Sequence, residues 1–261
     1  MATRSDRIHI AYDLTFATPF HCGTGIRVGL IDRTIVRDSR GNLYVPGSTF
    51  KGVLRERCEQ LERLYEELDE EMRELIASPH DEAIALRGLG QTITMITRIF
   101  GSHNHPGHLF FDDARQVEED QHQHESDEGD KQSEYADLQT QLYTQVRIDR
   151  PTRTAVKGAL YTSEFGIRSL TFKGSITGWL TCKTISSAES DGPTYSLLLL
   201  VAGLHMIDRL GGNKSTGKGR CTCEIRQLKV GENEYTLEQW QSWLDHLDAL
   251  SYYSTSQEEE A

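Results

Sequence analysis

The sequence lacks a long apolar run, since no stretch approaches the roughly 20 residues of a membrane-spanning helix. Its first residues, MATRSDRIHIAYDL, lack the apolar centre of a secretory signal peptide. The five cysteines are an odd number and lie scattered along the chain, which does not indicate a disulfide framework. We therefore expect a cytoplasmic protein with no membrane partner.

Positive charge is also scarce, because 28 Lys and Arg stand against 40 Asp and Glu and give a formal net charge of −12. Taken over the whole chain, this balance argues against a nucleic-acid-binding protein. The acidic residues are concentrated, however, in residues 117–137, in the stretch YEELDEEMRE and in the final QEEEA. We expect 117–137 to be a disordered acidic insert and 254–261 to be an acidic tail. The other segments are near neutral or basic, so local patches predict the partners better than the total charge.

A glycine-rich stretch, GGNKSTGKG at residues 211–219, is one residue short of the phosphate-binding P-loop motif. Gly219 stands where that motif needs Ser or Thr to hold magnesium. The stretch also follows a helical pattern and precedes an alternating strand, whereas a P-loop connects a strand to a helix. These departures argue against NTP hydrolysis, although an unrelated phosphate-binding enzyme and a flexible connector remain alternatives. With Lys214, Lys218 and Arg220, the loop instead predicts close approach of the backbone to a polyanion.

Hydrophobic periodicity predicts few helices and many antiparallel strands, which indicates an α+β protein. A ferredoxin-like (RRM-like) β-α-β-β-α-β core with insertions fits this order. Such a core leaves one sheet face open, and RRM-like modules bind RNA there, but the sequence shows no RNP-type aromatic pair. The expected elements are a strand at 7–18, a strand pair around a turn at 39–42, a long helix at 49–77, a short helix at 94–101, a strand at 109–117, several strands within 142–184, a helix at 196–210, a strand at 220–230 and a helix at 236–250.

Four sequence patterns occur in one order: IDRTIVRDSRGNLYVPGSTFKGVLRERCE, RIFG followed by FFDDA, VRIDRPTRTAVKGALYTSEF, and LGGNKSTGKGRC. Together they resemble the RAMP superfamily, and more narrowly the backbone subunit of type III CRISPR–Cas effector complexes. The resemblance covers residues 8–112 and 143–226. It implies a single domain over 1–261, with a ferredoxin-like core, a helical insertion and a thumb-like β-hairpin at 143–168.

The resemblance also implies partners and an activity. Copies of such a subunit stack along a CRISPR guide RNA that pairs with a target RNA, beside adjacent backbone copies, a large subunit and small subunits. In active members, an aspartate of a glycine-rich loop cleaves the target RNA with a divalent metal, here Mg²⁺ or Mn²⁺. Asp32 in GLIDRTIVRD matches that aspartate by position and would also be the metal ligand. Some copies only bind RNA, so a non-catalytic scaffold is the alternative.

The residues around Asp32 fit this role. A carboxylate between Arg27 and Arg33 stays ionised, and it can bind magnesium or orient an attacking 2′-hydroxyl. The structural alternative is an ion pair of Asp32 with Arg33 or Arg37. Asp38 precedes a turn and is expected to stabilise it. His21, which adjoins the same loop, is either a proton shuttle or an ordinary loop residue.

Cations elsewhere complete the expected RNA contacts. Lys51 and Arg55 are four residues apart and share a helix face, and backbone amides near Ser48 at that helix's start attract anions. The histidines of HNHPGH are spaced too closely, without a matching cysteine pair, to predict a zinc site. The expected RNA-binding residues are Arg27, Arg33, Ser48, Lys51, Arg55, Arg153, Lys157, Gly212, Lys214, Ser215, Lys218 and Arg220.

Overall fold

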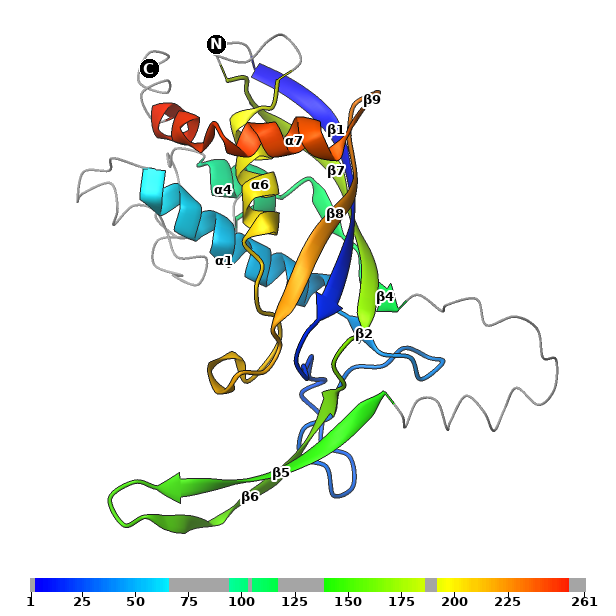
Figure 1. The fold of residues 1–261 in the computed structure, drawn as a ribbon, viewed down its shortest axis with the longest axis vertical. Helices are drawn as coiled ribbons and strands as arrows, with labels where there is room; N and C mark the ends of the chain where they lie inside the picture. Colours follow the sequence, from blue (N-terminus) through cyan, green and yellow to red (C-terminus); the bar gives the residue numbers. More distant parts are fainter. Residues whose placement is uncertain (1–2, 66–93, 103–104, 117–138, 186–191, 254–261) are drawn as a thin grey trace, which may run out of the picture.

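A computed structural model of the chain describes residues 3–65, 94–102, 105–116, 139–185 and 192–253 (Figure 1). The expected acidic insert at 117–137 and the expected acidic tail at 254–261 lie outside the described residues. The second half of the expected long helix, after Tyr65, lies outside them as well. Within the described part of the chain, no helix is long and apolar enough to cross a membrane.

A seven-stranded antiparallel sheet forms the body of the protein (Figure 1). The strand order is β2–β4–β7–β1–β8–β9, and β3 also pairs with β7. The α+β ferredoxin-like fold class expected from the sequence is confirmed. The strands are β1 (Thr3–Phe16), β2 (Tyr44–Val45), β3 (Leu109–Phe111), β4 (Ala114–Gln116), β7 (Thr171–Lys183), β8 (Cys221–Val230) and β9 (Asn233–Tyr235).

The central strand β1 confirms the alternation seen in the sequence. Its inward side chains, from Ile8 to Phe16 at every second position, are all buried. The Tyr12 ring stacks on Phe50 of helix α1 with ring centroids 4.2 Å apart. This row of apolar side chains fixes the register of the sheet, because a slip of one residue would turn it towards solvent.

Strand β8 contains a β-bulge that the sequence pattern does not reveal. Tyr12 of β1 pairs with Ile225 and Ala11 pairs with Gln227, so Arg226 is an extra residue without a partner in register. The bulge shifts the phase of the strand, and Ile225 and Leu228 are both buried although their spacing does not alternate.

The helices lie together on one side of the sheet (Figure 1). Helix α6 packs between α1 and the sheet, and every residue from Tyr195 to Leu204 is buried. The helix expected at 196–210 is therefore apolar all round, as a helix in the middle of the core is. The helical segments are α1 (Gly47–Tyr65), α4 (Met95–Phe100), α6 (Tyr195–His205), α7 (Leu237–Leu244) and the 3₁₀ turns η1 (Lys214–Thr216) and η2 (Leu247–Ser251).

Two expected strands are shorter or interrupted. The strand expected at 109–117 is divided at Asp112 and Asp113, whose carboxylates accept hydrogen bonds from the Ser175 hydroxyl and the Gly47 amide. Of the strand pair expected around 39–42, only β2 belongs to the sheet. The rest of 20–43 is a loop with isolated bridges within itself, and two further bridges join Phe20 and Arg33 to β6.

Strands β5 (Thr140–Asp149) and β6 (Thr154–Gly166) form a separate two-stranded sheet that projects from the body (Figure 1). This is the hairpin expected at 143–168, with its bounds moved a few residues towards the N-terminus. Gly166 pairs with Phe20 at the root of the hairpin, and a Cβ at this glycine would overlap the Phe20 ring. The hairpin is therefore anchored to the start of the loop 20–43.

Candidate nucleic-acid interface

Three segments that are distant in the sequence meet at the root of the hairpin: the loop 20–43, strand β6 and the glycine loop 211–219. The Gly212 amide donates to the His21 carbonyl at 2.8 Å. The Glu164 amide of β6 donates to the Arg33 carbonyl at 2.9 Å. These backbone bonds bring several of the expected RNA-binding residues onto one part of the molecule.

Asp32 is held by strand β6. Its Oδ2 accepts a hydrogen bond from the Thr162 amide at 2.9 Å, and its own amide donates to the Thr162 carbonyl at 2.9 Å. Its Oδ1 lies 3.2 Å from Nε of Arg27. The ion-pair partner is thus Arg27, and not Arg33 or Arg37 as the structural alternative had it. The carboxylate is 26% exposed and has a fixed orientation at the surface.

Glu164 fixes the rest of this loop, and sequence reasoning did not single it out. Its Oε1 lies 2.8 Å from Nη2 of Arg37, and its Oε2 accepts from the Ile35 amide at 3.1 Å. The glutamate is buried. The sequence feature that could have identified this residue is that it is the one acidic residue in the otherwise uncharged stretch YTSEFG. Arg37 is therefore structural, whereas Arg27 and Arg33 are the exposed cations next to Asp32.

His21 lies buried beneath the glycine loop. Its Nδ1 is 2.7 Å from the Glu164 carbonyl oxygen, and because a carbonyl only accepts, Nδ1 carries the proton. Burial lowers the pKa of the His21 imidazole, so the neutral form is favoured. A Cβ at Gly23 would lie 2.6 Å from Nε2, so little room is left around that nitrogen. This environment supports the interpretation of His21 as a structural residue of the loop.

The backbone of the glycine loop explains its departure from a P-loop. The loop joins helix α6 to strand β8, which confirms the helix–loop–strand order. Gly219 has a φ of +72°, and a Cβ there would overlap the Leu210 carbonyl oxygen. Ser or Thr at this position would therefore meet both steric and backbone strain. Asn213 also adopts the left-handed conformation, with a φ of 61°.

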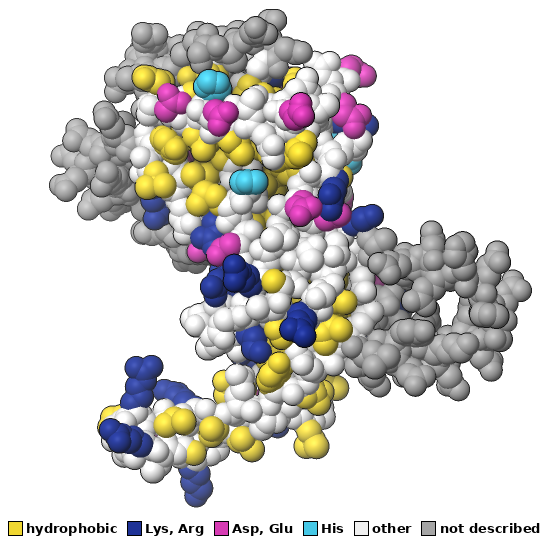
Figure 2. Space-filling view, in the orientation of Figure 1, with side chains coloured by type: hydrophobic (Ala, Val, Ile, Leu, Met, Phe, Trp, Pro, Cys, Tyr) yellow, Lys and Arg dark blue, Asp and Glu magenta, His cyan; other side chains and the backbone are white. Residues whose placement is uncertain are grey.

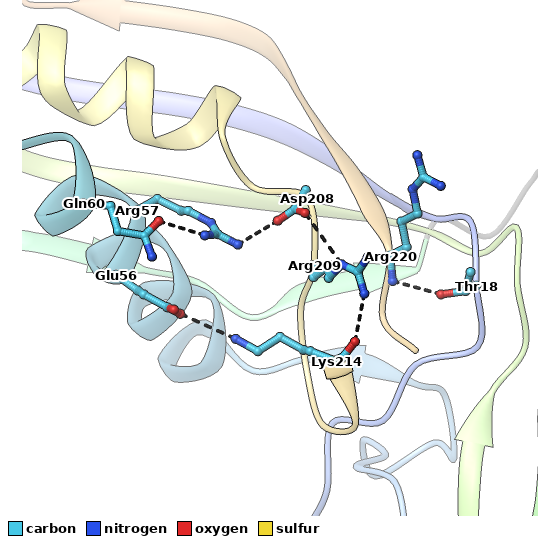
Figure 3. A network of polar contacts seen from close by, with 8 residues as sticks. All are labelled: Thr18, Glu56, Arg57, Gln60, Asp208, Arg209, Lys214 and Arg220. Carbon is cyan, nitrogen blue, oxygen red and sulfur yellow. Dashed lines mark hydrogen bonds and ion pairs between the residues drawn. The ribbon is translucent and has the colours of Figure 1, made fainter. Parts of the chain in front are cut away.

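Two lysines of the glycine loop are held by neighbours on either side. Lys218 Nζ lies 4.0 Å from the centre of the Tyr143 ring, at the root of the hairpin. Lys214 Nζ lies 3.5 Å from Oε2 of Glu56 on α1 (Figure 3). Both tie the loop to its neighbours, and neither Tyr143 nor Glu56 was expected from the sequence.

The other polar side chains near the loop differ in exposure and in their hydrogen-bond partners. The Arg220 amide donates to the Thr18 hydroxyl, while its guanidinium extends away from the network (Figure 3). Arg33 Nη1 donates to Oδ1 of Asn213 at 3.3 Å. Ser215 is exposed on turn η1. Arg33, Ser215 and Arg220 therefore present polar groups to solvent beside the two anchored lysines.

Lys51 and Arg55 make their contacts elsewhere. Arg55 Nε lies 2.8 Å from Oε1 of Glu59, and Nη1 donates to the Gly101 carbonyl at 3.3 Å. Lys51 Nζ lies 5.6 Å from the centre of the Phe111 ring, and burial together with Arg55 lowers the pKa of its ammonium group. These cations face α4 and β3, whereas Glu56 and Arg57 of the same helix face the glycine loop.

The start of α1 is partly satisfied by the chain itself. The Gly47 amide donates to Oδ1 of Asp113 at 2.9 Å, so a carboxylate already sits at the helix terminus. Ser48 is exposed beside it. This terminus is consequently less open to an added anion than the sequence indicated.

The tip of the hairpin is rich in cations. Arg153, with a φ of 56°, and Lys157 are exposed, as expected from the sequence. Arg147 and Arg150 are also exposed there, and the stretch RIDRPTR was the signal that could have identified them. In Figure 2, Lys and Arg gather on the hairpin and the adjoining part of the body, whereas Asp and Glu lie mainly over the far part.

The described residues contain no group of three or more His, Cys, Asp or Glu that could hold a metal ion. Asp32 is a single carboxylate at its site. Mg²⁺ is commonly bound through one or two carboxylates together with phosphate and water. A metal at Asp32 is therefore compatible with this chain only if RNA and water supply the other ligands.

Comparison with known proteins shows the family to which this architecture belongs. A search among curated proteins gave no match. One similar solved chain comes from the cryo-EM structure of the Type III-B Cmr-beta bound to cognate target RNA, with 14% sequence identity and a TM-score of 0.50. The match covers 83% of this chain and 96% of the other, which shows a shared fold. A family model of the RAMP superfamily matches residues 13–222. The chain thus belongs to the RAMP superfamily.

Proposed function

We propose that this chain is a guide-RNA-binding backbone subunit of a type III CRISPR effector complex, and that it cleaves target RNA paired with the guide. Membership of the RAMP superfamily supports the assignment, as does the fold shared with a chain of Type III-B Cmr-beta, a complex described as bound to cognate target RNA. The observation that carries the proposal is the position of Asp32. Its loop is joined to the hairpin through Thr162 and to the glycine loop through Arg33.

The RNA contacts follow from the arrangement of the cations. Arg33, Lys218 and Arg220 lie around the root of the hairpin, and Arg153 and Lys157 lie near its tip. Such a row neutralises successive phosphates without reading the sequence, and base pairing with the guide supplies the specificity. Lys51 and Arg55 form a second basic patch against α4 and β3.

Asp32 would act on the RNA backbone. The Thr162 amide fixes the direction of its carboxylate, which leaves the second oxygen beside Arg27 at the surface. There it takes the proton of the 2′-hydroxyl as that oxygen attacks the phosphorus. The bond from phosphorus to the 5′-oxygen breaks, and that oxygen leaves with a proton from water, while Arg27 and Arg33 lie close to the charge of the scissile phosphate. A bound Mg²⁺ or Mn²⁺, with Asp32 as its protein ligand, would add neutralisation of that phosphate.

Neighbouring subunits complete the proposed assembly, in which this chain contacts adjacent backbone copies, a large subunit and small subunits. The hairpin is suited to such contacts because it exposes apolar side chains. Leu142 is 58% exposed and Leu160 is 68% exposed. Exposed apolar side chains on one hairpin are typical of a protein interface.

Substitution of Asp32 in a complex assembled with guide RNA tests the cleavage step. Asp32→Asn keeps an oxygen to accept from the Thr162 amide, so we expect the fold and the affinity for guide RNA to persist while the cut at this protomer is lost. Asp38→Asn is the matched control. The Asp38 carboxylate accepts from the Arg40 and Asn42 amides at 2.9 Å within its own turn, and we expect cleavage to be retained.

The outcome separates the two alternatives. Persistent cutting at this position by Asp32→Asn, with magnesium or manganese present, would exclude Asp32 as the catalyst. A wild-type complex that binds guide and target RNA but never cuts would identify this copy as a non-catalytic scaffold.

A further inference from the structure

The face of the sheet opposite the helices carries two exposed aromatic side chains. Phe110 on β3 is 67% exposed, and Trp179 on β7 is 55% exposed. Phe110 lies opposite Thr177 in the ladder, and Thr177 and Trp179 project from the same face of β7. The two residues are therefore diagonal neighbours on adjacent strands, whose backbone positions are about 7–8 Å apart by ordinary sheet geometry.

Both rings are free of partners within the described residues. Neither makes an aromatic pair or a contact with a cation, although rings elsewhere in the described chain make both. Two ring faces are therefore available to a ligand. Sequence reasoning found no such pair because the two residues are 69 positions apart, counted as 179 − 110, and only the pairing of β3 with β7 brings them together.

An arginine and a histidine lie beside the rings. Arg7 on the neighbouring strand β1 lies opposite Trp179, and His9 lies opposite Thr177. Arg7 is exposed, and neither side chain forms an ion pair or hydrogen bond within the part of the chain that the structure describes. We use the name "aromatic face" for Arg7, His9, Phe110 and Trp179.

The acidic residues of the same sheet surface have partners. Asp13 Oδ2 lies 2.8 Å from Nε of Arg226, and Glu224 Oε2 lies 2.9 Å from Nη2 of the same arginine. On β9, Glu234 pairs with Lys229 at 3.5 Å. One guanidinium thus serves two carboxylates, and Asp112, close to Phe110, accepts from the Ser175 hydroxyl and forms no ion pair within the described residues. Arg7 is the unpaired cation of the aromatic face itself.

From this arrangement we infer that the aromatic face binds single-stranded RNA by stacking two unpaired bases on Phe110 and Trp179. Aromatic rings on adjacent strands of an open antiparallel sheet are suited to unpaired bases, and nearby cations contact the phosphates. A protein interface is the alternative occupant of such a surface, because aromatic residues and arginine are enriched there too, and the experiment below distinguishes the two. This surface is separate from the contacts proposed around Asp32 and the glycine loop.

Binding of a fluorescently labelled oligouridylate to the purified full-length chain tests the inference. We expect Trp179→Leu to weaken binding about tenfold, within the range for loss of an aromatic group that stacks on a base. Trp179→Phe keeps a stacking ring and should restore most of the affinity. Leu64→Ala removes an exposed apolar side chain on α1 and should have no effect. A duplex of the same RNA, whose base faces are covered, should bind Trp179→Leu and wild type equally.

Other results would overturn the inference and leave the proposed function intact. If Lys218→Ala weakens binding of oligouridylate while Trp179→Leu does not, RNA binds at the glycine loop and not at the aromatic face. If Trp179→Leu leaves RNA affinity unchanged but shifts the sedimentation of the protein from an oligomer to a monomer, the aromatic face is a protein interface. An equal loss of duplex binding would also reject base stacking.

Discussion

Lys218 Nζ lies 4.0 Å from the centre of the Tyr143 ring, which places a cation of the glycine loop over an aromatic ring at the root of the hairpin. The Phe165 ring lies beneath the same ammonium group at 5.4 Å. The loop and the hairpin are distant in the sequence, and this contact joins them next to Asp32. Lys218 is therefore oriented before any RNA binds, which reduces the side-chain entropy lost on binding.

This contact should be measurable as an energetic coupling. In a double-mutant cycle with Lys218→Ala and Tyr143→Leu, we expect a coupling of about 0.5–1 kcal/mol in the free energy of unfolding, typical of a partly exposed cation–π pair. Urea unfolding of the four proteins measures it. Tyr143→Phe keeps the ring and should retain most of the coupling. Additive effects of the two substitutions would show that the contact is not stabilising.

The glycine loop should tolerate a side chain at Gly217 better than at Gly219. Both glycines have a positive φ, so alanine at either position costs about 1 kcal/mol in backbone strain. At Gly217 nothing lies within 4 Å of an added Cβ, whereas at Gly219 the Leu210 carbonyl blocks it. We expect Gly219→Ala to lower the free energy of unfolding by clearly more than Gly217→Ala, as measured by urea unfolding. Equal losses would contradict the tight turn at Gly219.

The stability of the protein should fall on mild acidification because of His21. Burial lowers the pKa of this imidazole in the folded protein, so the unfolded chain binds the proton more readily. The contribution is fully present above the unfolded value of about 6.5 and is lost as the pH falls from there towards the folded value. Urea unfolding at pH 7 and pH 5 measures the difference.

Substitution assigns this pH dependence to a residue. His21→Asn retains an N–H donor for the Glu164 carbonyl without titrating, so we expect a smaller loss of stability on acidification than in the wild type. His105→Asn changes an exposed histidine and serves as the control. If His21→Asn leaves the pH dependence unchanged, another group accounts for it.

The cations should contribute unequally to RNA binding. Arg220→Ala removes an exposed guanidinium at the glycine loop, and we expect weaker binding across all sequences with a salt slope lowered by about one. Arg55→Ala should change the salt slope less, because that guanidinium already bonds Glu59 and the Gly101 carbonyl. Titrations over a range of salt concentrations test both. A larger change for Arg55 would place the RNA along α1.

Much of the fold could be predicted from the sequence, because local patterns and tertiary packing agree. The alternation of β1 and the helix–loop–strand order around 211–219 were predicted correctly, since each buries its apolar side chains as the pattern requires. The all-round burial of α6 and the bulge at Arg226 were not, because both depend on which other elements pack against them. The candidate site was likewise predicted only in part. The position of Asp32 followed from a resemblance, whereas its partners Arg27 and Thr162 came only from the structure.

By itself, the sequence determined the kinds of elements, the glycine positions and the concentration of acid outside the basic segments, because these follow from periodicity, backbone conformation and composition. Only the tertiary structure decided which groups meet. It placed Lys218 over Tyr143, turned Arg55 towards Glu59 and brought Phe110 beside Trp179. The physical reason is that strand pairing and loop docking join residues that are far apart in the chain. Local sequence patterns do not determine which of these residues come into contact.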